Sequence, residues 1–274
     1  MKHPTFSFND KNIVPLSDFT ASNVSLFGAK AANLAKAIQA GFSVPTGVAI
    51  SRLCTKETLE LFVRDIINSV GLPIAVRSSG VAEDSDNMAF AGMFETCLGI
   101  RSSEELLDAF NTVKNSGSSE HLKKYQGGVI DKEDIAVIIQ RMVNATRAGV
   151  AFSRDPMTSE KKVIIESNYG LGKSVVDGAI TPDSIEYIDE NTKEIFIGYK
   201  SKQIIMSDDG IYEKETKEED TKKCSLSDEE IKEIAELVCK VENKLGFPAD
   251  IEWAFDTNNT LWLLQARPIT TLNL

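Results

Sequence analysis

The sequence predicts an α+β fold, in which helices and strands are mixed without the regular alternation of a doubly wound sheet. Helical periodicity is clear in segments such as 228–245, whereas 135–139 is a short, continuous apolar run. Paired runs around Asn191 and around Asn258 and Asn259 indicate hairpins. With 274 residues, of which 42% are hydrophobic, the chain is long enough for one large domain or two lobes with a sizeable core.

In the first half of the chain, helical periodicity and stop signals define the elements. Residues 31–38 are expected to form a helix that ends at Gly41, after a loop of small residues at 26–30. A second helix is expected at 55–70, with Thr55 as its N-cap and Gly71 beyond its end. The other expected elements are a strand within 42–50, a strand at 74–76, a Ser-, Gly- and Asp-rich loop at 78–92, helices at 103–112 and 120–125, and a central strand at 135–139.

In the second half, short apolar strands are expected at 149–152 and 163–165, followed by a hairpin from 185–188 and 194–199. Residues 208–223 carry seven acids and four lysines with little apolar content, which indicates a solvated loop or an extended hairpin. An amphipathic helix at 228–245 follows a Ser-Asp cap region. A last hairpin is expected from 250–255 and 261–265.

Composition excludes several classes of partner. Lys and Arg total 30 against 41 Asp and Glu, so the net charge of −11 disfavours nucleic acid and anionic membranes as partners. No stretch reaches about 18 apolar residues and the first ten residues lack an apolar signal core, so we expect a soluble cytoplasmic protein. The four cysteines are dispersed, and the only histidines are His3 and His121, which disfavours a zinc site and a histidine base within the chain.

Two familiar nucleotide-binding motifs fail here. Gly172-Lys173-Ser174 resembles the end of a phosphate-binding loop, but that motif needs a glycine five positions before Gly172, where Ser167 stands. A dinucleotide fingerprint starting at Gly170 also fails, because its third glycine is replaced by Val175.

The remaining candidates are polar residues near strand ends. Arg77 directly follows the strand expected at 74–76, and a guanidinium fork followed by small hydroxyl residues is suited to hold a phosphate. The alternative for Arg77 is a structural salt bridge at a strand end. Gly92 would let a backbone approach a ligand closely, although a simple turn is the alternative.

The last expected hairpin carries a second candidate site. Asp250 and Glu252 alternate on one strand, as Gln265 and Arg267 do on the other, and residues two apart share a face of a strand. Carboxylate and amide oxygens suit Mg²⁺, which binds phosphates in turn. The alternative is a solvated hairpin face. Two tryptophans, Trp253 and Trp262, are expected on the opposite face, in the core.

Together these segments resemble the ATP-binding domain of the phosphoenolpyruvate synthase and pyruvate phosphate dikinase group, which includes rifampicin phosphotransferases. The matching stretches, in the family's order, are 28–34, 40–45, 76–84, 90–92, 137–143, 152–156, 169–172, 250–253 and 264–270. Two features depart from the family: Ala29 stands where a second glycine is usual, and the segment between Ser51 and Ile74 is shorter.

The resemblance implies an ATP-grasp fold, with ATP held between two lobes, here approximately 1–138 and 139–274 of a single unit. It implies neither a phosphohistidine domain nor a phosphoenolpyruvate/pyruvate barrel within 1–274. The implied phosphate contacts are Lys30, Arg77, Thr96, Arg267 and the glycine loop at Gly92; the adenine connector is Gln140, Arg141, Met142 and Val143; the Mg²⁺ pair is Glu252 and Gln265. Arg77, with Lys30 and Arg267, is implied in catalysis, since phosphoryl transfer needs positioning and charge neutralisation.

The resemblance also implies an ATP-dependent phosphotransferase. Neither His3 nor His121 lies in a segment that resembles the family's phosphorylated histidine, so we expect a separate phosphohistidine carrier or acceptor protein. One alternative is a free-standing ATP-dependent kinase or ligase that acts directly on a small molecule. Another is a non-catalytic ATP-sensing module, against which the retention of the phosphate and metal residues argues. The sequence leaves open the final acceptor, ADP or AMP as product, and the oligomeric state.

Overall fold

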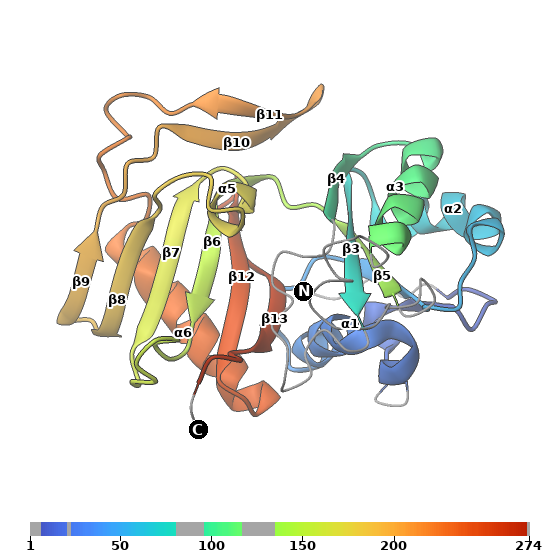
Figure 1. Ribbon diagram of the computed structural model, residues 1–274, viewed down its shortest axis with the longest axis horizontal. Coiled ribbons are helices and arrows are strands. Elements are labelled where there is room, and N and C mark those ends of the chain that lie inside the picture. Colours follow the sequence, from blue (N-terminus) through green and yellow to red (C-terminus); the bar gives the residue numbers. More distant parts are fainter. Residues whose placement is uncertain (1–6, 21–22, 81–95, 117–134, 273–274) are drawn as a thin grey trace, which may run out of the picture. The chain divides into compact units, whose positions relative to one another are not determined.

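The structure is a computed structural model that describes residues 7–20, 23–80, 96–116 and 135–272 (Figure 1). The chain divides into two compact units. Unit 1 comprises residues 1–41 and 45–142, and unit 2 comprises 42–44 and 143–274. This division falls four residues later than the lobe boundary expected after residue 138, because the last strand of unit 1 continues to Arg141. Helices and sheets are mixed in both units, which confirms the α+β prediction.

Unit 1 contains a five-stranded antiparallel sheet in the order β1-β2-β5-β3-β4. The expectation of a central strand at 135–139 is confirmed, since β5 is the middle strand. The elements of the unit are β1 (Ile13–Pro15), the short helix η1 (Leu16–Asp18), α1 (Val24–Gln39), β2 (Gly47–Ile50), α2 (Lys56–Val70), β3 (Ile74–Gly80), β4 (Thr96–Ile100), α3 (Ser103–Ser116) and β5 (Ile135–Arg141).

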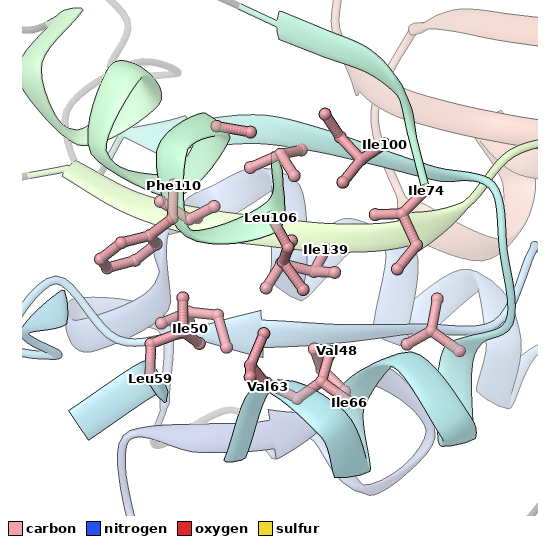
Figure 2. Close-up of a cluster of buried hydrophobic side chains, with 14 of the residues drawn as sticks. Val48, Ile50, Leu59, Val63, Ile66, Ile74, Ile100, Leu106, Phe110 and Ile139 are labelled. Carbon is pink, nitrogen blue, oxygen red and sulfur yellow. The ribbon is translucent and has the colours of Figure 1, made fainter. Parts of the chain in front are cut away.

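The core of unit 1 lies between its sheet and the helices α2 and α3 (Figure 2). The apolar positions of α2 recur at helical spacing and are buried. Thr55 caps the helix by accepting a hydrogen bond from the Thr58 amide at 3.2 Å, and Gly71, at φ 83°, ends it as expected. The labelled core residues of Figure 2 come from β2, β3, β4, β5 and both helices: Val48, Ile50, Leu59, Val63, Ile66, Ile74, Ile100, Leu106, Phe110 and Ile139.

Helix α1 differs from its expected course. The loop expected at 26–30 is wrong, because the helix already begins at Val24 and is interrupted only at Gly28, whose φ of 81° and ψ of 167° are not helical. A Cβ atom on Gly28 would lie 2.4 Å from the carbonyl oxygen of Ser79. The Ala31 amide donates to the Ser79 hydroxyl at 3.3 Å. The glycine therefore lets α1 approach the backbone of β3.

Unit 2 is built on a six-stranded antiparallel sheet in the order β13-β12-β6-β7-β8-β9. Both expected hairpins are present, as β8 with β9 and as β12 with β13. The strands are β6 (Ala145–Phe152), β7 (Val163–Tyr169), β8 (Asp183–Asp189), β9 (Thr192–Phe196), β12 (Ala249–Asp256) and β13 (Leu261–Pro268), with the helices α5 (Lys173–Val176) and α6 (Asp228–Leu245).

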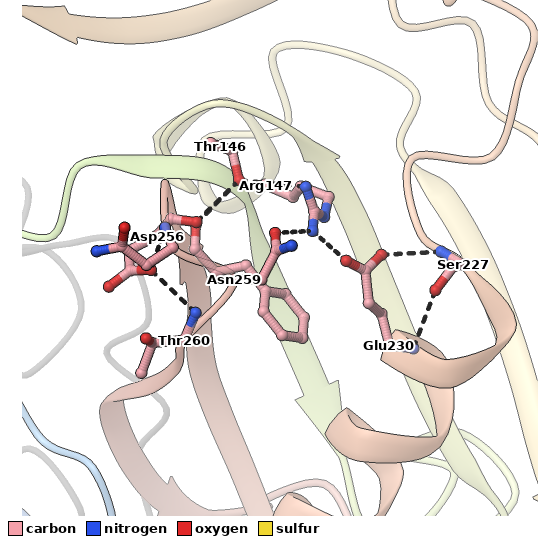
Figure 3. A network of polar contacts seen from close by, with 9 residues as sticks. Thr146, Arg147, Ser227, Glu230, Asp256, Asn259 and Thr260 are labelled. Atoms are coloured by element: carbon pink, nitrogen blue, oxygen red, sulfur yellow. Dashed lines mark hydrogen bonds and ion pairs between the residues drawn. The ribbon is translucent and has the colours of Figure 1, made fainter.

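Helix α6 covers one face of this sheet and has the bounds that the sequence predicts. It begins with a capping box between Ser227 and Glu230 (Figure 3). Glu230 also forms an ion pair with Arg147 of β6, whose guanidinium donates to Asn259 at 2.9 Å and lies over the Phe255 ring. Because Arg147 and Phe255 are cross-strand neighbours, α6 packs on the face that carries Phe255.

A separate two-stranded hairpin, β10 (Lys202–Ser207) with β11 (Gly210–Glu215), lies near one end of the sheet (Figure 1). The acidic segment 208–223 thus contributes a hairpin strand, one of the two forms expected for it. The hairpin is tied to the end of β7, where the Leu171 amide donates to the Ile204 carbonyl at 2.7 Å. The helix expected at 120–125 and residues 81–92 of the expected loop lie outside the described residues.

Candidate functional site

The register of β12 and β13 places the predicted metal-binding pair together. Glu252 stands directly opposite Gln265, and Asp250 stands directly opposite Arg267. Directly opposed residues on antiparallel strands have Cβ atoms about 5 Å apart and share a face of the sheet. Trp253 points to the other face, toward α6, where it is buried and contacts Phe255 edge to face. The four polar side chains therefore lie on the face that α6 leaves uncovered.

A β-bulge interrupts this hairpin immediately beyond the pair. The register shifts after Glu252, so that Trp253 opposes Leu263 and Trp262 opposes Ala254. The expectation that Trp262 lies on the core face is therefore wrong, because the extra residue returns it to the face of Glu252. There Trp262 is half-buried and donates from Nε1 to Asp256 at 2.9 Å.

Arg267 is held by a carboxylate on the neighbouring strand. Its Nε donates to Oδ2 of Asp250 at 2.8 Å, and its terminal nitrogen lies 2.8 Å from the same oxygen. The Asp250 side chain is only 10% exposed, whereas the Arg267 side chain is 32% exposed and so remains accessible. The pair fixes the guanidinium beside Gln265, two positions away on the same face of β13. The sequence indicated that Asp250 belongs to this patch but not that it positions Arg267.

The donor set of the patch fits Mg²⁺. Glu252 supplies a carboxylate and Gln265 an amide oxygen, which are hard oxygen ligands. Among the described residues no three His, Cys, Asp or Glu side chains form a metal site of their own. A cation held by Glu252 and Gln265 would thus take its other ligands from water and substrate phosphates, which is the usual arrangement for Mg²⁺.

In unit 1, the structure sets two of the predicted phosphate contacts side by side and places the third, Lys30, next to the residue of α1 that docks on β3. Arg77 and Thr96 are cross-strand neighbours of β3 and β4. Arg77 also shares a face of β3 with Ser79, the residue on which α1 docks just after Lys30. The expectation that Arg77 follows a strand end is wrong: Ser78 and Ser79 are buried and paired to β5, so β3 continues to Gly80.

The predicted adenine connector, residues 140–143, leads from β5 to β6. Its first side chain is used internally, because Gln140 is buried and donates to the Pro45 carbonyl at 3.2 Å. The Arg141 amide donates to Thr46, and the Met142 amide donates to Pro73. The side chain of Gln140 and the backbone amides of Arg141 and Met142 therefore have partners within unit 1, so these three groups are not free to bind a base. Gly92 lies outside the described residues.

Glu166 is a further acidic residue on the face of Glu252, and it was not predicted. Glu252 pairs with Val150 on β6, and Val150 pairs with Glu166 on β7, so the three side chains share a face of the sheet. Glu166 is half-buried, and burial raises the pKa of its carboxyl above the usual value. Only the pattern of Ile164, Glu166 and Asn168 alternating with Ile165 and Ser167 could have suggested its orientation from the sequence.

Two α+β units, with a carboxylate–amide pair on one sheet face of the second, are features of an ATP-grasp nucleotide-binding protein. Residues 55–274 match the family described as the pyruvate phosphate dikinase, AMP/ATP-binding domain. The chain belongs to this family. The matched region begins after Lys30, whereas all the other predicted site residues lie within it. Family membership therefore agrees with the ATP-grasp fold and establishes an ATP-binding domain.

Two curated relatives illustrate the similarity. "Uncharacterized phosphotransferase YvkC" of Bacillus subtilis is 36% identical over 206 residues, covering 73% of this chain and 24% of the relative. A "probable phosphoenolpyruvate synthase" of Methanothermobacter thermautotrophicus is 30% identical over an aligned length of 339 residues, covering 98% of this chain and 48% of the relative. The chain thus spans about half or less of the length of these relatives.

A solved D-alanine-D-alanine ligase from Coxiella burnetii is 12% identical to the chain. The comparison has a TM-score of 0.43 and covers 92% of this chain and 50% of the ligase. Within the described residues, no helix combines the length and the apolar character that crossing a membrane requires.

Proposed function

We propose that the chain binds Mg²⁺-ATP and transfers a phosphoryl or pyrophosphoryl group to a histidine on a separate carrier protein. The observation that carries this proposal is the register of β12 and β13, which sets Glu252 opposite Gln265 and beside a fixed Arg267. This arrangement offers oxygen ligands to a cation and a guanidinium to a phosphate on the same face. Relatives named as phosphoenolpyruvate synthase and phosphotransferase support the same reaction class.

The proposed roles divide between the two units. Glu252 and Gln265 would hold Mg²⁺, which when bound bridges phosphate oxygens and neutralises charge. In unit 2, Arg267 contacts the phosphates, with Asp250 fixing its orientation. In unit 1, Lys30 and Arg77 supply positive charge to the phosphates, and Thr96 supplies a hydroxyl. Of these, Arg77 is the residue that we place at the transferred group, where charge develops in the transition state.

The transfer step has two balanced forms. In the phosphoryl form, a neutral imidazole nitrogen of the carrier attacks the γ-phosphorus, the bond to the bridging oxygen breaks, and ADP leaves with the bonding electron pair. In the pyrophosphoryl form, the same nitrogen attacks the β-phosphorus and AMP leaves. The other ring nitrogen then releases its proton. The leaving nucleotide, ADP or AMP, distinguishes the two forms.

A labelling experiment with two forms of ATP tests the proposal. Full-length chain, Mg²⁺ and candidate histidine carrier domains are incubated with ATP labelled at the γ- or at the β-phosphorus. Label from the γ-position enters the carrier in both forms, whereas label from the β-position enters it only in the pyrophosphoryl form. Absence of label on every histidine domain, including the products of neighbouring genes, would refute transfer to a separate carrier.

The same assay separates the alternatives. ATP consumption with metabolite pools and no added protein would establish direct action on a small molecule instead. ATP binding without any turnover would establish a sensing module. The metal assignment is tested with Glu252→Gln, which should raise the Mg²⁺ concentration needed for half-maximal ATP binding, because an amide binds Mg²⁺ more weakly than a carboxylate. Glu194→Gln, an exposed position on β9, is the matched control.

A further inference from the structure

Glu166 is a half-buried carboxylate that has no hydrogen bond or ion pair with any other described residue. Its neighbours on the same face are uncharged: Val150 and Ser184 stand opposite it on β6 and β8, and Ile164 and Asn168 flank it along β7. Burying a carboxylate without a partner is costly, so such groups normally meet a ligand or a counter-charge. Glu186 on β8, by comparison, is paired with Lys162 at 2.8 Å.

The position of Glu166 restricts what it can bind. It lies on the face of Glu252 and Gln265, but the strand β6 stands between Glu166 and Glu252. Two strand spacings amount to roughly 10 Å. Mg²⁺ ligands lie only about 2 Å from the ion, so Glu166 and Glu252 cannot share one cation. A carboxylate also repels phosphate oxygens. Glu166 is therefore suited to a neutral group of a ligand whose phosphates and metal lie near Glu252.

Asn168 marks the edge of the accessible part of this face. Its side chain is fully buried, and its amide donates to the Ser174 hydroxyl at 2.9 Å and to the Lys202 carbonyl at 3.1 Å. The segment around α5 and the start of β10 thus covers β7 beyond Glu166. A ligand that extends from Glu252 across β6 therefore reaches Glu166 just before this covered end.

Two groups of a nucleotide can donate hydrogen bonds to a carboxylate. The exocyclic amino group of adenine is one, but an acceptor nitrogen lies beside it on the same base edge and would face the carboxylate oxygens. The ribose 2′- and 3′-hydroxyls are the other, and they offer two adjacent O–H donors to the two oxygens of one carboxylate. An acidic residue binds a ribose hydroxyl in the same way in dinucleotide-binding folds.

We infer that Glu166 forms a ribose-binding subsite and makes the chain selective for ribonucleotides over deoxyribonucleotides. This inference rests on the proposed function, because it places the ribose of the same ATP whose phosphates lie near Glu252 and Gln265. Glu166 would be a specificity-determining residue that contacts the sugar and takes no part in the transfer step.

The test compares ATP with 2′-deoxy-ATP and 3′-deoxy-ATP in the presence of Mg²⁺, with dissociation constants measured by calorimetry on the full chain. The wild-type chain should bind ATP roughly ten-fold or more tightly than either deoxy form, because each deoxy form lacks one hydrogen bond to the charged carboxylate. Glu166→Ala loses both hydrogen bonds, so it should bind ATP at least as weakly as the wild type binds the deoxy forms and should show no preference for ATP over them. Glu194→Ala, the exposed control, should keep the full preference.

The outcomes separate this inference from the function on which it rests. Binding of ATP with no preference over the deoxy forms, or an unchanged preference in Glu166→Ala, overturns the ribose subsite and leaves the proposed function intact. No binding of any adenine nucleotide refutes both. Glu166→Gln, which keeps the shape of the side chain, guards against misfolding and should keep only a smaller part of the preference. A changed Mg²⁺ requirement with an unchanged sugar preference in Glu166→Gln would mean a metal role and would also overturn the inference.

Discussion

Replacing Gly28 with alanine tests how α1 is docked on the sheet of unit 1. Two costs add at this position. The backbone, at φ 81° and ψ 167°, lies in a region that is essentially restricted to glycine, and occupying it costs about 1–3 kcal/mol. The new methyl group would also lie 2.4 Å from the Ser79 carbonyl oxygen and 2.5 Å from its hydroxyl, which forces a backbone shift costing about 1–3 kcal/mol.

Gly71 provides a matched control for the conformational cost. Its φ of 83° and ψ of 152° lie in the same region, but a Cβ atom there would meet only the Arg141 side chain, at 3.8 Å. Gly71→Ala should therefore pay only for its backbone conformation. The free energy of unfolding of Gly28→Ala should fall by about 1–3 kcal/mol more than that of the control, because only the Gly28 substitution overlaps with Ser79. At an m-value of about 2 kcal/mol per molar urea, this lowers the midpoint of unfolding by a further 0.5–1.5 M or so.

The assay is urea unfolding followed by circular dichroism, combined with hydrogen exchange in β3, because a chain of two units need not unfold in one step. Exchange should quicken in β3, where Ser79 is displaced, and Mg²⁺-ATP affinity should fall because Lys30 lies two residues from the substitution. Equal midpoints for Gly28→Ala and Gly71→Ala would refute the argument that close approach, rather than backbone conformation, requires Gly28.

Three other predictions concern single side chains. Arg77→Ala should lower the rate of phosphoryl transfer about 10²–10³-fold with little change in the unfolding midpoint, and an unchanged rate in single-turnover assays would contradict its role. Lys200→Met should cost about 3–5 kcal/mol, because it leaves the fully buried Asp183 without its 2.6 Å ion-pair partner; Lys222→Met, at an exposed site, should cost almost nothing in the same unfolding assay. Burial alone would raise the pKa of Asp155, but hydrogen bonds from two backbone amides and a lysine lower it to about 2. Asp155 should thus stabilise the fold above about pH 4, with the stability lost as the pH falls toward 2, and acid unfolding of Asp155→Asn should lack this component.

The elements that the sequence predicted correctly are those whose signals are local. The bounds of the helix at 228–245 follow from a capping box at one end and a left-handed Gly246 at the other. The alternation of Asp250 with Glu252, and of Gln265 with Arg267, predicted the shared face, since alternation is a property of the strand itself. These are short-range features that need no knowledge of the rest of the chain.

The errors arise where tertiary contacts override the local pattern. Ser78 and Ser79 read as loop residues, but pairing with β5 and docking of α1 draw them into β3. The β-bulge after Glu252 reverses the face of Trp262, and nothing in the local alternation signals an inserted residue. Glu166 escaped prediction because its significance depends on the register of β6 and β7 with β12, which lies far from them in the sequence.

The charges of the unit 2 face bear on how a triphosphate binds there. Arg267 is balanced by Asp250, so this pair contributes no net charge. Glu252 and Glu166 each add a carboxylate to the same face. A triphosphate would therefore meet a face that is on balance negative, unless a cation is bound to Glu252 and Gln265 first or arrives with the nucleotide. On the proposed function, Mg²⁺ is thus a requirement for ATP to occupy unit 2. Within unit 2, the net positive charge that opposes the phosphates must therefore come from that metal ion.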